Sequence, residues 1–165
     1  MIAPRSSFHE GHRRKFLVVI DDTPECDRAI VYAAKRAQRT AGGVVMLYVI
    51  VPEAGAPRWL GVEEVMRAEA YGAADEVLAR AVERARQIAG IIPETAIREG
   101  NRAEEIVNLI GADTDIAILV LAAGTDSEGP GPLVTAIAGR AAGTFPVPIT
   151  IVPGTLSDEE IVAGA

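Results

Sequence analysis

Continuous apolar runs, separated by segments with a helical spacing of apolar residues, constrain the fold of this chain more than any other feature. Three runs carry many β-branched residues and no polar alternation, at residues 15–20, 44–51 and 116–123. Such runs are typical of strands that are buried on both faces of a parallel sheet. A shorter strand is predicted at residues 95–99, and a final one, with alternating apolar residues, at residues 146–153.

Helices are predicted between all of these strands. The first has Thr23 as its N-cap and Pro24 as its first residue. The second is long, from residue 62 to about residue 89, and Trp59 and Leu60 are expected to pack beside it. Its predicted buried stripe consists of Val65, Met66, Ala70, Ala73, Val77, Ala81, Ala85 and Ile88.

The third helix is predicted to start at Asn101, because Asn101 and Glu104 have the spacing of a capping box. Gly131 and Pro132 open the fourth, and residues 157–164 form one more helical turn. Five strands that alternate with four helices predict parallel pairing through right-handed crossovers. The predicted fold class is therefore α/β, a three-layer, doubly wound, five-stranded parallel sheet.

The bulk composition narrows the class of protein. The chain has 165 residues, enough for one domain with a sizeable core, and 49% of them are hydrophobic. A net charge of −7 and a pI near 4.9 oppose binding to nucleic acid or to anionic membranes, because phosphates are repelled. No apolar run approaches the roughly 20 residues that span a bilayer. The expected partners therefore include neither nucleic acid nor membrane.

In a doubly wound sheet, ligands bind beyond the carboxyl ends of the strands, near the point where the strand order reverses. That edge should carry Asp21, Asp22 and Thr23, the end of the second strand, and the loop after Ala123. The adjacent carboxylates could hold a ribose hydroxyl or Mg²⁺. The alternative is that one of them caps the following helix, and this alternative is favoured for Asp22.

The loop "AAGTDSEGPGPLVTAIAG" at residues 122–139 resembles a phosphate cradle, since Gly124, Gly129 and Gly131 would let main-chain N–H groups approach an anion. Two features of the loop oppose that interpretation. Pro130 and Pro132 each remove an N–H donor. Asp126 and Glu128 add negative charge. A triphosphate would need counter-charge from a metal or from Arg102 or Arg140. The alternative is an acidic rim loop whose glycines serve turn geometry.

Three polar or reactive residues lie outside that edge. Cys26 is the single cysteine, which excludes an intrachain disulfide and fits a reducing compartment, so a cytoplasmic location is expected. Its place on an apolar helix face favours a buried small hydrophobe over a redox-active thiol. Residues 1–13 are expected to form a polar, mobile arm, in which His9 and His12 are solvated rather than metal ligands.

Four segments give the chain a recognisable pattern: "KFLVVIDDTPECDRAI", "VVMLYVI", "IREGNRAEEIVNLIGADTDIAILVLAAG" and "VPITIVPG". This pattern resembles the universal stress protein family over residues 14–154, which leaves residues 1–13 as an arm and 155–165 as a tail. The resemblance implies a Rossmann-like sheet of the adenine nucleotide alpha hydrolase-like type, with strand order 3-2-1-4-5. It also implies a homodimer formed through the last strand, from Val147 to Val152.

Members of this family either bind ATP or do not. In those that bind it, an Asp after strand one and the main chain late in strand two meet the adenosine, and a loop G-x2-G-x9-G-[S/T] holds the phosphates. Asp21 and Val49 match the first two elements. The loop departs from the third: nine residues separate Gly129 from Gly139, but the flanking positions are Asp126 and Arg140. The candidate ligand-binding residues are Asp21, Asp22, Thr23, Val49, Gly124, Thr125, Gly129, Gly131 and Thr135.

The sequence contains no nucleophile elbow, no H-E-x-x-H and no Walker sequence, and no catalytic residue or metal ligand is assigned. The leading hypothesis is a non-catalytic, cytoplasmic, homodimeric stress-response protein with a degenerate nucleotide loop. The competing hypothesis is an ATP-binding protein, with Mg²⁺ as a cofactor, that acts as a switch or a slow ATPase. The alternation in the final strand supports pairing of two copies at the sheet edge in either case.

Overall fold

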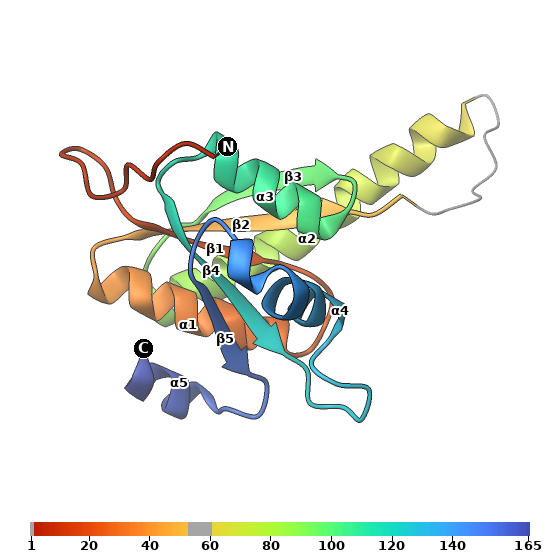
Figure 1. The fold of residues 1–165 in the computed structure, drawn as a ribbon. Coiled ribbons are helices and arrows are strands. Elements are labelled where there is room, and N and C mark those ends of the chain that lie inside the picture. Colours follow the sequence, from red (N-terminus) through yellow and green to blue (C-terminus); the bar gives the residue numbers. More distant parts are fainter. Residues whose placement is uncertain (1, 53–60) are drawn as a thin grey trace.

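The chain folds into a five-stranded parallel sheet with helices on both faces, as described by a computed structural model over residues 2–52 and 61–165 (Figure 1). The strand order is β3-β2-β1-β4-β5, which confirms the predicted fold class and the order 3-2-1-4-5. The strands are β1 (Lys15–Val19), β2 (Gly43–Ile50), β3 (Glu94–Glu99), β4 (Ile116–Ala123) and β5 (Ile149–Pro153). All of their pairings are parallel.

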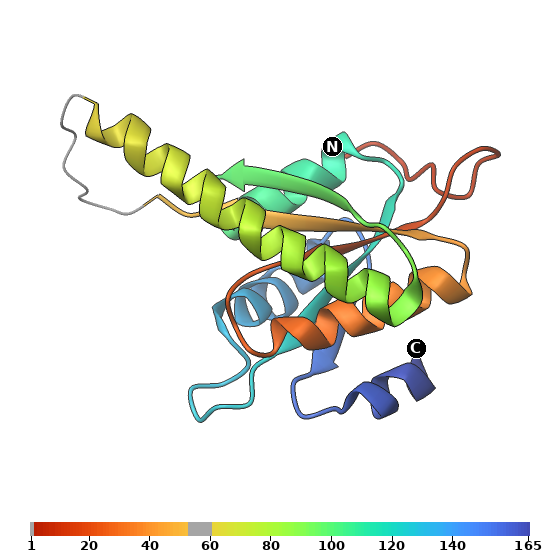
Figure 2. The same cartoon turned by 180° about the vertical axis from the view of Figure 1, so that it is seen from behind.

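Two helical layers enclose this sheet (Figures 1 and 2). One layer contains α1 (Cys26–Arg39), α2 (Val62–Ala89) and the short C-terminal α5 (Asp158–Gly164). The other contains α3 (Arg102–Ala112) and α4 (Pro132–Val134), which continues as a π-helix over Thr135–Arg140 and a 3₁₀ turn over Ala142–Thr144. No helix of the described part of the chain is long and apolar enough to cross a membrane.

Strand β1 lies at the centre of the sheet and supplies both cores. Phe16 and Val18 face α1, α2 and α5, whereas Leu17 and Val19 face α3 and α4. Because successive side chains of a strand point to opposite faces, a strand flanked by two helical layers must be apolar at every position. This requirement explains why the runs without polar alternation predicted the central strands correctly.

The start of α1 differs from the prediction, because the helix begins at Cys26 rather than after Thr23. The main-chain N–H of Thr23 donates to Oδ1 of Asp21 at 2.9 Å, and the N–H of Cys26 donates to the carbonyl of Thr23 at 3.3 Å. The Asp21 carboxylate thus caps a turn that precedes the helix. Thr23 and Pro24 belong to that turn, so the prediction of Thr23 as the N-cap was wrong.

The buried stripe of α2 also differs at its N-terminal end. Val65 and Met66 are 59% and 42% exposed, because the first turns of α2 extend past the edge of the sheet (Figure 2). The later part of the helix packs on the core through Ala74, Leu78, Ala81, Ala85 and Ala89. The predicted Ala73 is exposed, and Val77 and Ile88 are only partly buried, so the prediction was off by one residue at these positions. Trp59 and Leu60, which were expected to pack beside this helix, lie outside the described residues.

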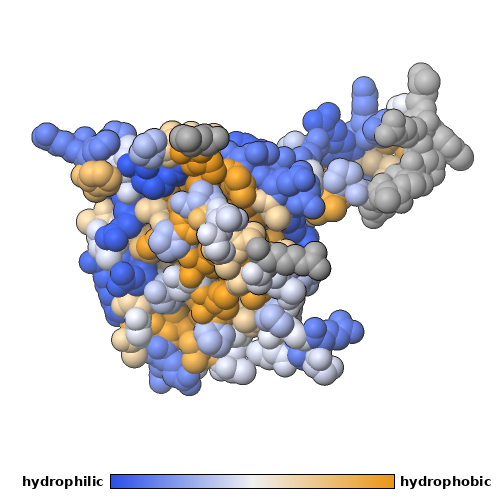
Figure 3. Space-filling view, in the orientation of Figure 1, coloured by the Kyte–Doolittle hydropathy of each residue, from blue (hydrophilic) through white to orange (hydrophobic). Residues whose placement is uncertain are grey.

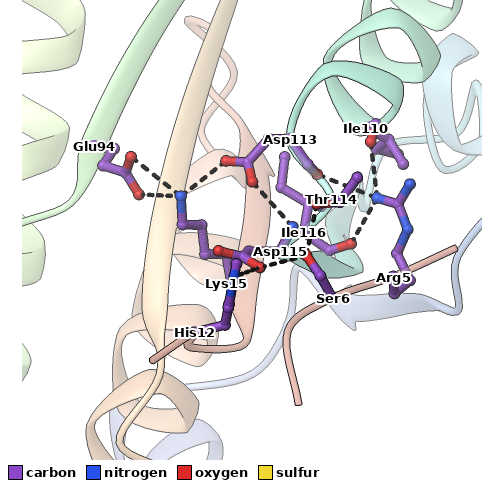
Figure 4. A network of polar contacts seen from close by, with 10 residues as sticks. All are labelled: Arg5, Ser6, His12, Lys15, Glu94, Ile110, Asp113, Thr114, Asp115 and Ile116. Atoms are coloured by element: carbon purple, nitrogen blue, oxygen red, sulfur yellow. Dashed lines mark hydrogen bonds and ion pairs between the residues drawn. The ribbon is translucent and has the colours of Figure 1, made fainter. Parts of the chain in front are cut away.

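The N-terminal arm is hydrogen-bonded to the body of the protein at the amino edge of the sheet (Figure 4). Nδ1 of His12 and Oγ of Ser6 lie 2.8 and 2.9 Å from the same oxygen of Asp115. His12 is exposed, as expected, and in addition it contacts a carboxylate, which the sequence analysis did not predict. Nη1 of Arg5 donates to three carbonyl oxygens, at 2.8, 3.2 and 3.1 Å, on Ile110, Asp113 and Ile116.

The C-terminal helix α5 confirms the helical turn predicted at residues 157–164. Ile161 is buried against α1, and Ser157 caps the helix by accepting from the N–H of Glu160 at 3.1 Å. The carboxylate of Asp158 accepts from Nη2 of Arg28 at 2.5 Å and from Nη2 of Arg84 at 2.8 Å. These ion pairs connect α5 to α1 and to α2.

The same two arginines also bind Asp27, which completes a cluster of two cations and two anions. Burial raises the pKa of Asp27, but the hydrogen bonds from Arg84 and Arg28 outweigh burial and hold that pKa below its ordinary value. Hydrogen bonds from Arg84 and then Arg28 likewise lower the pKa of Asp158. The folded state therefore binds fewer protons at acidic pH than the unfolded chain does.

This difference predicts acid sensitivity. The contribution of the cluster to the free energy of unfolding is complete above the unfolded Asp pKa of about 4, and it is lost as the pH falls through the lower folded values. Urea unfolding between pH 6 and pH 2.5 should show a shallower loss of stability in Asp158→Asn than in the unmodified chain. Glu159→Gln, on the exposed side of α5, should behave like the unmodified chain; equal slopes for all three proteins would contradict the prediction.

Candidate functional site

The candidate site lies where β1 and β4 end side by side, because the strand order reverses between these two strands. The chain leaves β1 toward the α1 layer and leaves β4 toward the α4 layer. The two connections therefore separate over the carboxyl ends of the strands. Asp21–Thr23 follow β1, and residues 124–131 follow β4.

A cavity of about 100 Å³, here named the strand-end cavity, lies between these two connections. Asp21, Thr23 and Gly131 line it, as the sequence predicted, together with Glu25 and Arg102. Arg102, the first residue of α3, is thus brought from the opposite layer to the side of Asp21. It supplies one of the two counter-charges considered from the sequence; the side chain of the other, Arg140, lies outside the described part.

Several N–H groups of the loop after β4 donate hydrogen bonds to acceptors within the same loop. The N–H of Gly124 donates to the carbonyl of Pro130 at 3.0 Å, and the N–H of Gly129 donates to the carbonyl of Asp126 at 3.3 Å. The N–H of Glu128 donates to the side chain of Asp126 at 3.0 Å. Gly129 has a φ of +105°, which a side chain would strain, so the glycine serves the turn. In this conformation the loop thus pairs the N–H groups of Gly124, Glu128 and Gly129 internally and does not offer these three to a ligand.

Glu25 is a site residue that the sequence analysis missed. A Cβ atom built on Gly124 would lie 3.1 Å from Oε1 of Glu25, so this carboxylate lies directly over the first glycine of the loop. Glu25 is the N-cap position of α1, and its side chain makes no capping hydrogen bond. It therefore adds negative charge to a place where a phosphate cradle would need positive charge.

The other predicted residues do not gather around the strand-end cavity. Val49 is 4% exposed in the core under α3 and α4. Oγ1 of Thr135 donates to the carbonyl of Gly131 at 2.9 Å, within its own helical turn. The methyl group of Thr125 faces Gly154, the residue after β5. Asp22 lines a different cavity.

That second space, here named the α1–α2 cavity, has a volume of about 310 Å³ and lies on the other side of the turn at Asp21. Its charged lining residues are three aspartates, Asp21, Asp22 and Asp27, and two arginines of α2, Arg80 and Arg84. Within residues 2–52 and 61–165, no group of three or more His, Cys, Asp or Glu side chains is placed to hold a metal ion.

Cys26 lies between the two cavities but is only 6% exposed. Burial raises the pKa of its thiol to about 12, so the nucleophilic thiolate is scarce at neutral pH. The thiol packs as a small hydrophobic group, with Sγ 3.6 Å from the carbonyl oxygen of Val19.

We expect this thiol to be protected from alkylation. In the folded protein at pH 7.5, iodoacetamide should label Cys26 more than about 100-fold more slowly than in 8 M urea, because both the pKa and the burial oppose reaction. Mass spectrometry of timed samples measures the two rates. Rapid labelling of the folded protein would contradict the prediction and restore a redox role for Cys26.

The sheet order and the position of the site define a doubly wound α/β protein with its ligand edge at the β1–β4 boundary. The chain belongs to the universal stress protein family, whose model matches residues 12–153. No curated protein is significantly similar to it in sequence.

Several solved structures share the fold. Universal stress protein UspA from Lactobacillus plantarum has a TM-score of 0.67 and 21% identity, over 84% of this chain and 97% of that one. A universal stress protein family protein from Arabidopsis thaliana, solved with AMP bound, has a TM-score of 0.59 and 20% identity, over 88% and 94%. The universal stress protein from Archaeoglobus fulgidus in complex with dAMP has a TM-score of 0.52 and 17% identity, over 84% and 97%.

Proposed function

We propose that this chain is a non-catalytic universal stress protein that acts as a homodimeric interaction module and does not bind ATP. The observation that carries the proposal is the hydrogen bond from the N–H of Gly124 to the carbonyl of Pro130. It closes the loop after β4 on itself and uses a donor that a phosphate would need. The single, buried cysteine is compatible with a reducing, cytoplasmic location.

Charge and size support the same proposal. Among the residues that line the strand-end cavity, Arg102 faces two carboxylates, from Asp21 and Glu25. A triphosphate placed there would be repelled by these carboxylates and by the acids of the loop itself. The cavity of about 100 Å³ is also well below the roughly 300–1,000 Å³ of ordinary ligand pockets. An intact ATP would fit only after the loop had opened.

The dimer is proposed to form at the free edge of β5. This strand pairs only with β4 among the described strands, so its other edge offers unpaired main-chain groups. Ile151 is 38% exposed on this strand. Figure 3 shows apolar side chains gathered over the middle of the face that carries α3, α4 and β5. An edge strand beside apolar surface is suited to pairing across a two-fold axis.

Binding of an adenine nucleotide is the second candidate function, and the position of Arg102 favours it. A cation and the carboxylate of Asp21 line one cavity at the ligand edge, where they could meet a phosphate and a ribose hydroxyl. Structural neighbours solved with cAMP, dAMP and AMP support an adenine nucleotide as the ligand. This function requires the loop at residues 124–131 to move away from Glu25.

A thermal-shift measurement separates these two functions. If the leading proposal is correct, ATP with Mg²⁺ at 1 mM should change the melting temperature by less than about 1 °C, because no site with a Kd near or below that concentration exists. If AMP stabilises the protein by several degrees, the nucleotide function stands. That shift should then vanish in Asp21→Ala and Arg102→Ala, and persist in the control Glu69→Ala on the exposed part of α2.

The dimer is tested at β5. Ile151→Glu places a charge on the free edge and should convert the dimer to a monomer in size-exclusion chromatography with light scattering, since an unpaired charge in an apolar interface is costly. Ile92→Glu is the matched control, because Ile92 is 80% exposed and lies outside β5. A monomeric unmodified chain, or a dimer that survives Ile151→Glu, would refute pairing through this strand.

A further inference from the structure

The α1–α2 cavity is lined by side chains of both charges, and its arginines are not used by the proposed function. Asp21 and Asp22 present carboxylate oxygens, which accept hydrogen bonds from hydroxyl groups, and a third lining carboxylate, Asp27, is paired with Arg84. Arg80 and Arg84 present guanidinium groups, which bind oxyanions. The volume of about 310 Å³ is within the range of small-ligand pockets. A cavity with both kinds of group matches a small molecule that has hydroxyl groups and an anion.

The carboxylate of Asp158 already occupies the arginines beside this cavity. Its two oxygens are held separately, Oδ1 by Nη2 of Arg28 at 2.5 Å and Oδ2 by Nη2 of Arg84 at 2.8 Å. Arg28 of α1 and Arg84 of α2 thus bind one oxyanion together. Arginine pairs of this kind also bind phosphate groups. Asp158 does not itself line the cavity, but it is an internal anion held by Arg84, which does.

The segment that supplies this carboxylate lies outside the region that defines the family. The family model ends at residue 153, and α5 follows it. Asp158 also changes the local charge. Without it, Arg28 and Arg84 would face only the carboxylate of Asp27, and the cluster would carry one net positive charge. With Asp158 present, the cluster is neutral and attracts no further anion.

We infer that the α1–α2 cavity is a second binding site, for a small phosphate ester that carries hydroxyl groups, and that α5 inhibits this site through Asp158. The ester's phosphate displaces the Asp158 carboxylate from Arg84, while its hydroxyl groups donate to Asp21 and Asp22. Since binding and displacement are coupled, whatever draws α5 away from Arg84 raises the affinity of the site.

The attachment of α5 allows the carboxylate to be tested without removing the helix. Arg28 Nη1 donates to the carbonyl of Leu156 at 2.8 Å, and Arg39 Nη1 donates to the carbonyl of Val162 at 2.6 Å. Ile161 is buried between these two points. Asp158→Asn therefore removes the charge while three other contacts keep α5 docked, whereas deletion of α5 would expose apolar core.

Isothermal titration calorimetry with ribose 5-phosphate as the probe tests the inference. Asp158→Asn should bind it at least about ten-fold more tightly than the unmodified chain, and Glu159→Gln, one residue along the same helix, should not. In Asp158→Asn/Arg84→Gln the gain should disappear. Ribose should bind more weakly than its phosphate by a similar factor, and inorganic phosphate should also gain affinity in Asp158→Asn. Equal affinity in the unmodified chain and Asp158→Asn, or a gain that survives Arg84→Gln, would overturn the inference.

Two further measurements keep this test decisive. Circular dichroism checks the folding of each variant; if Asp158→Asn is unfolded, Asp158→Ser and an NMR titration of the Arg84 Nε–H signal in the unmodified chain replace it. An Arg84 signal that does not move at saturating ribose 5-phosphate would also overturn the inference. Arg102→Ala should leave the gain unchanged, because Arg102 lines the strand-end cavity only. Failure of nucleotide binding at that cavity is thus distinguishable from failure of this site.

Discussion

The parallel pairing of β1 with β2 on one side and with β4 on the other is the constraint on which the rest of the structure depends. A parallel pair needs a crossover, and crossovers of one hand place the helices on opposite faces once the strand order reverses. Both faces of β1 must then be covered, which requires the unbroken apolar run at residues 16–20. The same reversal opens the space between the turn at Asp21 and the loop at Gly124, so the fold and the candidate site have one origin.

Most of the fold could be predicted from the sequence because it depends on local periodicity. The runs that form β1, β2 and β4, and the Asn101 side chain that accepts from the N–H of Glu104, are readable over a few residues. The errors and omissions have a common cause. Exposure of Val65 depends on how far α2 extends past the sheet, and the contact of His12 with Asp115 depends on two segments about a hundred residues apart. No local pattern contains that information.

The candidate site was predicted less completely, for a related reason. Its main-chain frame follows from topology, so Asp21, Thr23 and Gly131 line the cavity as the strand ends required. The charge balance of the site does not follow from topology, because Arg102 comes from α3 and Glu25 from the start of α1. The prolines and acids at residues 126–132 predicted a loop unsuited to phosphate, and this stays a prediction. What the sequence could not indicate was that Gly124 and Pro130 would bond to each other.

The hydrogen bond between Gly124 and Pro130 has a consequence for the stability of the protein. The N–H groups of Gly124 and Gly129 donate to carbonyls of the loop itself, so these two donors need no bound anion to be paired. A ligand raises the free energy of unfolding only by binding the folded state, so under the proposed function the protein gains no stability from a metabolite at that edge. If the leading proposal is correct, the free energy of unfolding stays constant when nucleotide concentrations change.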